Sequence, residues 1–226
     1  MAALLPNATS RKSQPSAATN LLLLGFLIAS AITAAGCSNG PAAIEPVEFD
    51  ADEASAAAME EYDSNQDDCL DDAELAAMPG VMKYKDKYDV DQDGCVSQAE
   101  MAQRIESWSH QGVGLRTLLI EVLLDGRPLP DAEVRMIPEK YLGDGPKLAT
   151  GKTDGGGGAK MSVDPEYLPE NLRQARMRGV FAGTYRIAVT HPHVKLPEKY
   201  TEGVALGDEV ARDTIGDRIL LELKRK

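Results

Sequence analysis

Oxygen-bearing side chains recur at fixed intervals in two twelve-residue segments of the chain, 63–74 and 89–100. In both segments they occupy positions 1, 3, 5, 9 and 12, and an apolar residue, Leu70 or Val96, occupies position 8. Alternate residues of a tightly turning loop point inward, so this spacing brings carboxylate and amide oxygens together. A hard cation such as calcium takes about 6–8 oxygens at about 2.3–2.6 Å. The spacing therefore predicts two calcium sites.

Both segments resemble the EF-hand calcium loop, and the second matches its pattern at every ligand position. In that pattern position 7 offers a backbone carbonyl, position 9 commonly acts through water, and position 12 is a glutamate that binds with both oxygens. The resemblance assigns one Ca²⁺ ion to Asp63, Asn65, Asp67, the carbonyl of Cys69, Asp71 and Glu74. It assigns a second Ca²⁺ ion to Asp89, Asp91, Asp93, the carbonyl of Cys95, Ser97 and Glu100.

The two segments differ at position 6, which requires a left-handed backbone. Gly94 adopts this conformation freely, whereas Asp68 does so at a cost of about 1–2 kcal/mol. We therefore expect the first site to be the weaker one. The alternative interpretation is that both segments are acidic turns on a solvated surface, but their tandem repetition favours the cation sites.

Negative charge is concentrated around these segments. The chain has 36 acidic and 24 basic residues, and residues 50–106 hold 17 of the acids but only four bases. Residues 107–226 are nearly balanced, with 17 acids and 18 bases. Charge that served only solubility would not be distributed this unevenly. The acidic balance also argues against nucleic-acid binding, which needs a basic face.

Short helices are expected around the two segments. Residues 52–62 are rich in alanine, with Asp50 or Asp52 available as N-cap. Pro79 and Gly80 end the helix that follows the first segment. In the helix after the second segment, Met101, Ile105 and Trp108 share one face and are expected to belong to a small core.

The three cysteines suggest two kinds of modification. Cys69 and Cys95 occupy equivalent positions of the two segments, so they form a disulfide if their Cα atoms lie within about 7 Å, and otherwise remain two free thiols. Cys37 ends the sequence Ala34-Ala35-Gly36-Cys37, directly after an apolar run.

The first 36 residues have the layout of an export signal. They contain two bases and no acid, and an apolar run covers residues 21–35. A run of this length is short for a membrane span, which needs about 20 residues, although an uncleaved anchor helix is the alternative. The sequence ending in Cys37 resembles the bacterial lipobox, which implies lipidation of Cys37 and attachment to a lipid bilayer. Residues 37–48 then form a tether, and the implied location is the outer membrane or periplasm.

Short strands separated by glycine and proline turns are predicted from residue 114 onward. Examples are the apolar run 115–124, the turn Asp125-Gly126 and the alternating segment 183–190. The segments 124–134, 149–154 and 183–187 resemble the carboxypeptidase-regulatory, transthyretin-like β-sandwich. Residues 164–178 are an insertion relative to that pattern, with three arginines at its end: Arg173, Arg176 and Arg178.

No pattern typical of catalysis is found. There is no serine nucleophile elbow, no cysteine–histidine pair and no phosphate-binding loop, and the Gly155–Gly158 run lacks the lysine of a P-loop. His191 and His193 are spaced for metal chelation, but they lack further ligands, so a strand end is the better interpretation.

Taken together, the sequence predicts an α+β multidomain protein in which a helical EF-hand pair is followed by an antiparallel β-sandwich of the transthyretin-like class. The expected parts are a signal peptide (1–36), a lipidated tether (37–48), the EF-hand pair (49–112) and the sandwich (113–226). The expected function is that of an exported, membrane-anchored calcium-binding protein with a non-catalytic interaction module. An adhesion module that captures a protein or glycan on the sandwich is the alternative, and a hydrolase has only fold analogy behind it.

Overall fold

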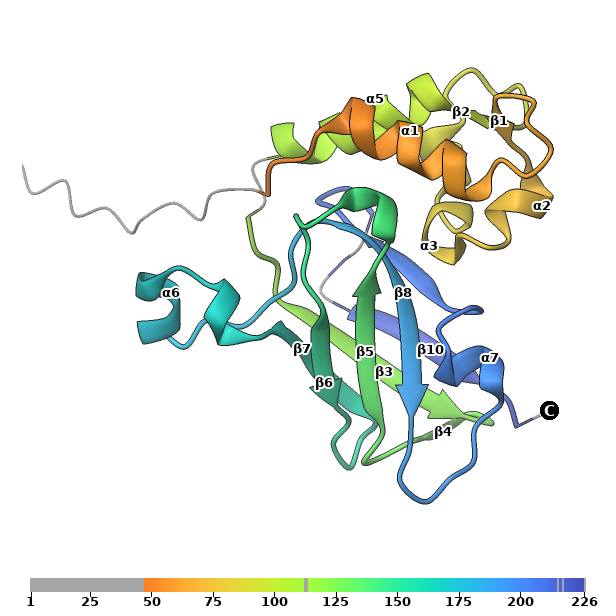
Figure 1. Cartoon of the computed structure of the whole chain (residues 1–226). Coiled ribbons are helices and arrows are strands. Elements are labelled where there is room, and N and C mark those ends of the chain that lie inside the picture. The colour runs from red at the N-terminus through yellow and green to blue at the C-terminus, as the bar shows by residue number, and fades with distance from the viewer. Residues whose placement is uncertain (1–46, 112–113, 215, 217, 226) are drawn as a thin grey trace, which may run out of the picture. The chain divides into compact units, whose positions relative to one another are not determined.

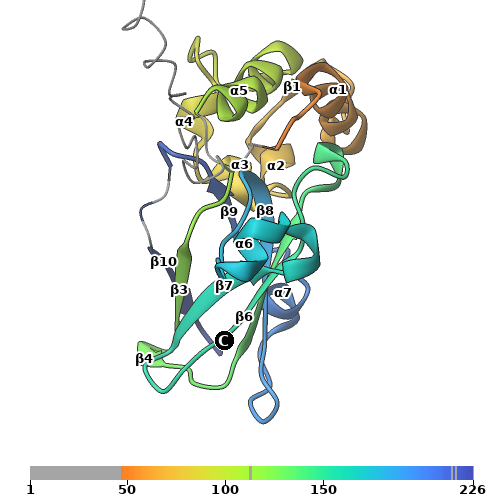
Figure 2. The same ribbon diagram turned by 90° about the vertical axis from the view of Figure 1, so that its left-hand side faces the viewer.

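The computed structural model of the chain describes residues 47–111, 114–214, 216 and 218–225 (Figure 1). The signal peptide, Cys37 and nearly all of the tether therefore lie outside the described residues. The described residues all belong to one compact unit. A curled eight-stranded sheet accounts for most of the regular structure in the described part (Figures 1 and 2).

The sheet has the strand order β10-β3-β7-β6-β5-β8-β9, and β4 pairs with β3. All pairs are antiparallel except β10 with β3, which is parallel and pairs Ile219 with Ile120. The strands are β3 (Leu118–Leu124), β4 (Arg127–Pro128), β5 (Glu133–Pro138), β6 (Ala149–Lys152), β7 (Gly158–Val163), β8 (Gly183–Thr190), β9 (Gly207–Val210) and β10 (Arg218–Leu223).

Alternation of apolar and polar residues explains most of these strands. In β3 and β10 every second side chain is buried, so one face of each strand enters the core and the other does not. Asp125 and Gly126 both have a positive φ, 51° and 79°, as the predicted hairpin turn requires. At Gly157, also of positive φ, a Cβ atom would stand 2.7 Å from the carbonyl oxygen of Val122, so this turn needs glycine.

The acidic segment contains two longer helices and three single turns. Helix α1 (Ala51–Tyr62) begins at Asp50, whose side chain accepts a hydrogen bond from the Glu53 N–H at 3.0 Å, which confirms this predicted N-cap. Helix α5 (Gln98–His110) begins at Ser97. Between them lie β1 (Cys69–Leu70), α2 (Asp72–Leu75), α3 (Pro79–Met82), α4 (Lys85–Tyr88) and β2 (Val96–Ser97). The remaining short elements are η1 (Lys140–Leu142), η2 (Pro165–Tyr167), α6 (Glu170–Gln174) and α7 (Glu198–Thr201).

The predicted fold class is wrong. The described residues are mostly β, and they contain neither a helical EF-hand pair nor a two-layer sandwich. The helices between the two acidic loops have only four residues each, too few to form two helix–loop–helix units. The strands form one sheet because β7 pairs with β3 through Gly158–Met161 and with β6 through Ser162 and Val163. Alternation predicts which residues form strands, but it does not distinguish one curled sheet from two stacked sheets.

The acidic segment and the sheet also share a core. Met101, Ile105 and Trp108 are buried as predicted, but their cluster is completed by Tyr141 and Ala211 from the second half of the chain. At the edge of the sheet, α3 lies against β9 so closely that a Cβ atom on Gly207 would stand 2.4 Å from the nitrogen of Gly80. Glycine at these positions allows the two backbones to meet.

Charged groups are buried at this junction. Asp208 and Glu209 of β9 are both fully buried, and their partners come from the acidic segment. Arg104 of α5 pairs with Glu209 and also donates to Asp213 at 2.9 and 3.0 Å. Tyr84 donates to Asp208 at 2.8 Å, and Lys83 pairs with the same carboxylate. A buried carboxylate without a partner is costly, so β9 and the helices depend on each other.

Another buried carboxylate, that of Glu139, lies near the end of α1. It accepts a hydrogen bond from the Tyr62 hydroxyl at 3.1 Å, and the Nε of Arg186 lies 3.4 Å away without hydrogen-bond geometry. Burial raises the pKa of Glu139 to about 7, although Arg186 and Tyr62 both act in the opposite direction.

We expect Arg104→Met to lower the free energy of unfolding by about 3–5 kcal/mol, because it leaves Glu209 buried without its cation. Adding Glu209→Gln should recover part of this loss. Arg173→Met, which breaks the exposed pair with Glu170, should cost about 1 kcal/mol or less. Urea unfolding of the variants measures these differences. Equal losses of unfolding free energy in Arg104→Met and Arg173→Met would contradict the claim that β9 and the helices depend on each other through this buried pair.

Glu139 should make the folded chain less stable as pH rises. Because its folded pKa of about 7 exceeds its ordinary value of 4.5, the folded state retains a proton that the unfolded chain releases between these values. From about pH 5 to pH 8, the wild type should lose up to about 3 kcal/mol more stability than Glu139→Gln. Urea unfolding at both pH values tests this, with the exposed Glu198→Gln as control. If Glu139→Gln and the wild type lost the same unfolding free energy between pH 5 and pH 8, Glu139 would not be the cause of the pH dependence.

Candidate metal centre

The first acidic loop, residues 63–74, is held in shape by its own carboxylates. Asp63 accepts hydrogen bonds from the backbone N–H of Gln66 at 2.7 Å and of Asp68 at 3.0 Å. Asn65 accepts from the N–H of Asp67 at 2.9 Å, and Asp67 accepts from the N–H of Cys69 at 3.1 Å. These side chains therefore turn toward the inside of the loop.

The second loop, residues 89–100, repeats the same pattern. Asp89 accepts from the N–H of Gly94 at 3.1 Å, Asp91 from that of Asp93 at 3.2 Å, and Asp93 from that of Cys95 at 3.0 Å. Both residues at position 6 have the left-handed backbone expected from the sequence, with φ of 67° at Asp68 and 101° at Gly94. The two loops thus share one conformation.

The glutamate at position 12 closes each loop. Glu74 accepts a hydrogen bond from the N–H of Ser64 at 2.8 Å, and Glu100 accepts one from the N–H of Val90 at 2.9 Å. Each glutamate thereby reaches from the end of its loop back to the beginning. A hydrogen bond from the Asp71 backbone is the main cause that lowers the pKa of Glu74. Burial opposes the shift at Glu100, but hydrogen bonds led by that from the Ser97 backbone outweigh it and lower the pKa.

Three contacts join the two loops. Strands β1 and β2 pair Leu70 with Val96, and both of these position-8 side chains are fully buried. Cys69 and Cys95 are linked by a disulfide, with their Cα atoms 5.8 Å apart. Lys85 donates to Asp72, next to the first loop's position 9, and to the carbonyl oxygen of Gly94 in the second. The loops are consequently held next to each other.

The donor set of the second loop fits a hard cation. Asp89, Asp91 and Asp93 each place a carboxylate oxygen within 4.8 Å of the others. Asp89 is only 8% exposed, and its Oδ1 atom is buried with no hydrogen-bond partner among the described residues. Since a buried, unpaired carboxylate oxygen is costly, this atom requires a partner. A calcium ion is a suitable partner because it accepts oxygen ligands from carboxylates.

The two predicted ligands at position 9 have a different main role. The Asp71 side chain accepts hydrogen bonds from the N–H groups of Ala73 and Glu74, and thus caps α2. The Ser97 hydroxyl lies 2.7 Å from a Glu100 carboxylate oxygen and caps α5. Both residues are part of a capping box, so their side-chain oxygens already bind the helix N-terminus. We therefore expect Asp71 and Ser97 to contact an ion through a water molecule.

His191 and His193 do not form a metal centre in the described part of the chain. The Nδ1 atom of His191 accepts from the N–H groups of His193 and Val194 at 3.0 and 2.9 Å. Its Nε2 atom lies 2.9 Å from the carbonyl oxygen of Pro130. Both ring nitrogens of His191 are therefore used to hold the loop after β8.

Sequence reasoning missed the residues that attach the loops to the rest of the fold. No sequence pattern marks Lys85, Asp208 or Glu209 as buried partners, because lysines and adjacent acids normally lie on the surface. The one usable signal was Gly207, since a glycine at the start of a strand often indicates close backbone approach.

Among the described helices, none has both the length and the apolar composition that crossing a membrane requires. A comparison of the chain with protein-family models, curated proteins and solved structures finds no match.

Proposed function

We propose that the chain is an exported, membrane-anchored calcium-binding protein whose two acidic loops each hold one Ca²⁺ ion. The observation that carries this proposal is the buried, unpaired Oδ1 atom of Asp89, which lies among the carboxylates of Asp91 and Asp93. The matching hydrogen-bond pattern of the first loop, closed by Glu74, extends the proposal to a second ion.

Calcium would act on the stability of the acidic segment. The segment 50–106 carries a large excess of negative charge, and two Ca²⁺ ions offset four of these charges. An ion that binds only the folded state, at a free concentration 100 times its dissociation constant, adds about 2.7 kcal/mol of stability. The disulfide between Cys69 and Cys95 keeps the loops close before the ions bind, which reduces the ordering that binding has to supply.

The export and anchoring part of the proposal is supported by the sequence alone. The apolar run 21–35 and the lipobox-like sequence that ends at Cys37 favour a bacterial lipoprotein of the outer membrane or periplasm. A disulfide between Cys69 and Cys95 is consistent with an oxidising compartment. The absence of catalytic patterns in the sequence favours a binding role over an enzymatic one.

Isothermal titration of the purified, oxidised protein with CaCl₂ tests the calcium sites. We expect two ions per chain for the wild type and one for Glu100→Gln, because glutamine cannot supply two anionic oxygens to the second ion. The second loop should bind Ca²⁺ more tightly than the first, since the left-handed backbone of Asp68 in the first loop costs conformational free energy. The matched control is Glu106→Gln, an exposed change on the same helix, which should leave two ions.

A wild type that takes up no calcium at millimolar concentration would refute the proposal. Equal stoichiometry in Glu100→Gln and Glu106→Gln would refute the assignment of the second site.

A further inference from the structure

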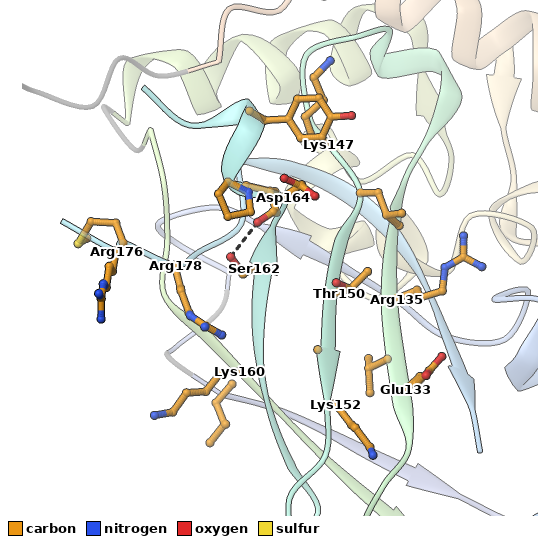
Figure 3. A pocket seen from close by; sticks show the side chains of 18 of the residues that line it. Glu133, Arg135, Lys147, Thr150, Lys152, Lys160, Ser162, Asp164, Arg176 and Arg178 are labelled. Atoms are coloured by element: carbon orange, nitrogen blue, oxygen red, sulfur yellow. Dashed lines mark hydrogen bonds between the residues drawn. The ribbon is translucent and has the colours of Figure 1, made fainter. Parts of the chain in front are cut away.

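A groove of about 1150 Å³ lies on the outer face of β5, β6 and β7, beside the insertion 164–178 (Figure 3). It is separate from the acidic loops, since no residue of 63–100 lines it. Its volume slightly exceeds that of the usual small-molecule pocket, about 300–1000 Å³, and it is partly open to solvent. The groove is thus suited to part of an extended ligand.

The floor of the groove is polar. Arg135 of β5 pairs with Thr150 of β6, and Thr150 pairs with Ser162 of β7, so the three residues form a row across the sheet. With neighbouring strands about 4.8 Å apart, the row spans about 10 Å. The Thr150 hydroxyl can both donate and accept hydrogen bonds, whereas the Ser162 hydroxyl donates its proton to the Val163 carbonyl oxygen at 2.9 Å and can only accept from a ligand. Both can therefore bind a ligand that is itself rich in hydroxyl groups.

The groove has an excess of positive charge although the whole chain has a net charge of −12. Its seven basic residues are Arg135, Lys147, Lys152, Lys160, Arg173, Arg176 and Arg178. Its four acidic residues are Glu133, Asp154, Asp164 and Glu166. This local reversal of sign favours an anionic ligand.

Several of these cations are available for a ligand, although two are already engaged in ion pairs. Lys152 pairs with Asp131, and Arg173 pairs with Glu170. Over the ranges that the structure describes, no ion pair engages Arg135, Lys160, Arg176 or Arg178. Figure 3 shows Lys160, Arg176 and Arg178 on one side of the hydroxyl-bearing floor and Arg135 on the other. A chain lying in the groove would therefore meet cations on both sides.

Apolar surface borders the same groove. Tyr167, Met177 and Leu148 are 46%, 42% and 39% exposed, and all three line it. The ammonium group of Lys147 lies 5.6 Å from the centre of the Tyr167 ring. An aromatic ring next to cations and hydroxyls can contact the C–H face of a sugar while the neighbouring groups bind its polar substituents.

We propose that this groove binds an anionic polysaccharide that carries carboxylate or sulfate groups. An acidic peptide fits less well, because β5, β6 and β7 are interior strands and offer no free edge for an added strand. A nucleic acid fits less well because its closely spaced phosphates would face the four carboxylates. Sugar hydroxyls, in contrast, can donate hydrogen bonds to these carboxylates.

Binding of purified protein to oligogalacturonate and to heparin fragments tests the proposal and distinguishes carboxylate from sulfate recognition. We expect binding to at least one of them, and weaker binding at higher salt. Arg135→Ala/Lys160→Ala should lose about tenfold or more in affinity, since it removes one cation from each side. Both side chains are exposed on strands, so the fold should persist, and circular dichroism verifies this.

The matched control is Lys195→Ala/Arg212→Ala, which removes the same charge from exposed positions outside the groove. It should bind like the wild type. An equal loss in both double variants, or no binding of either saccharide, would overturn the proposal. Tighter binding of poly-aspartate, single-stranded DNA or phosphatidylglycerol vesicles than of both saccharides would also overturn it, because the groove would then serve another class of partner.

Discussion

The buried carboxylates of β9 fix the acidic segment against the edge of the sheet. Asp208 and Glu209 are adjacent in the strand and both lie fully out of solvent. Such groups persist only with partners, and here the partners are Lys83, Tyr84, Tyr88 and Arg104, all from the acidic segment. The close approach of Gly80 to Gly207 allows these groups to meet. The edge of the sheet is thus completed by the segment that carries the loops.

This constraint gives the proposed calcium sites their position. Helix α5 contains both Glu100, which closes the second loop, and Arg104, which pairs with Glu209. The two residues are one helical turn apart, so a change in the loop is linked through a rigid element to the sheet. The disulfide and the pairing of β1 with β2 connect the first loop to the second. If the loops bind calcium, its effect on stability should extend beyond the acidic segment.

Much of the local structure could be predicted from the sequence. The strands at 133–137 and 183–190, the turn at Asp125-Gly126, the N-cap Asp50 and the buried face of Met101, Ile105 and Trp108 follow from alternation, turn chemistry and helical spacing. The positive φ at Asp68 followed from its place in the loop. These features depend on residues close together in the chain.

The features that sequence reasoning missed are long-range. β9 was not predicted because Asp208 and Glu209 break the alternation, and their burial arises only when α3 covers the strand. The parallel pairing of β10 with β3 joins segments about a hundred residues apart, and no local pattern specifies it. The single curled sheet depends on β7 pairing with two strands at once. The groove combines basic residues from three strands and an insertion, and the sequence alone points only to the arginines of the insertion.

Amide hydrogen exchange of the purified protein, compared in calcium and in chelator, tests the central claim most directly. At a free calcium concentration 100 times the dissociation constant, we expect about hundredfold slower exchange in residues 63–100 for amides that exchange through opening of these loops. We also expect slower exchange in β9, which packs on α3. Identical exchange rates throughout residues 63–100 in calcium and in chelator would contradict the claim that these loops bind calcium.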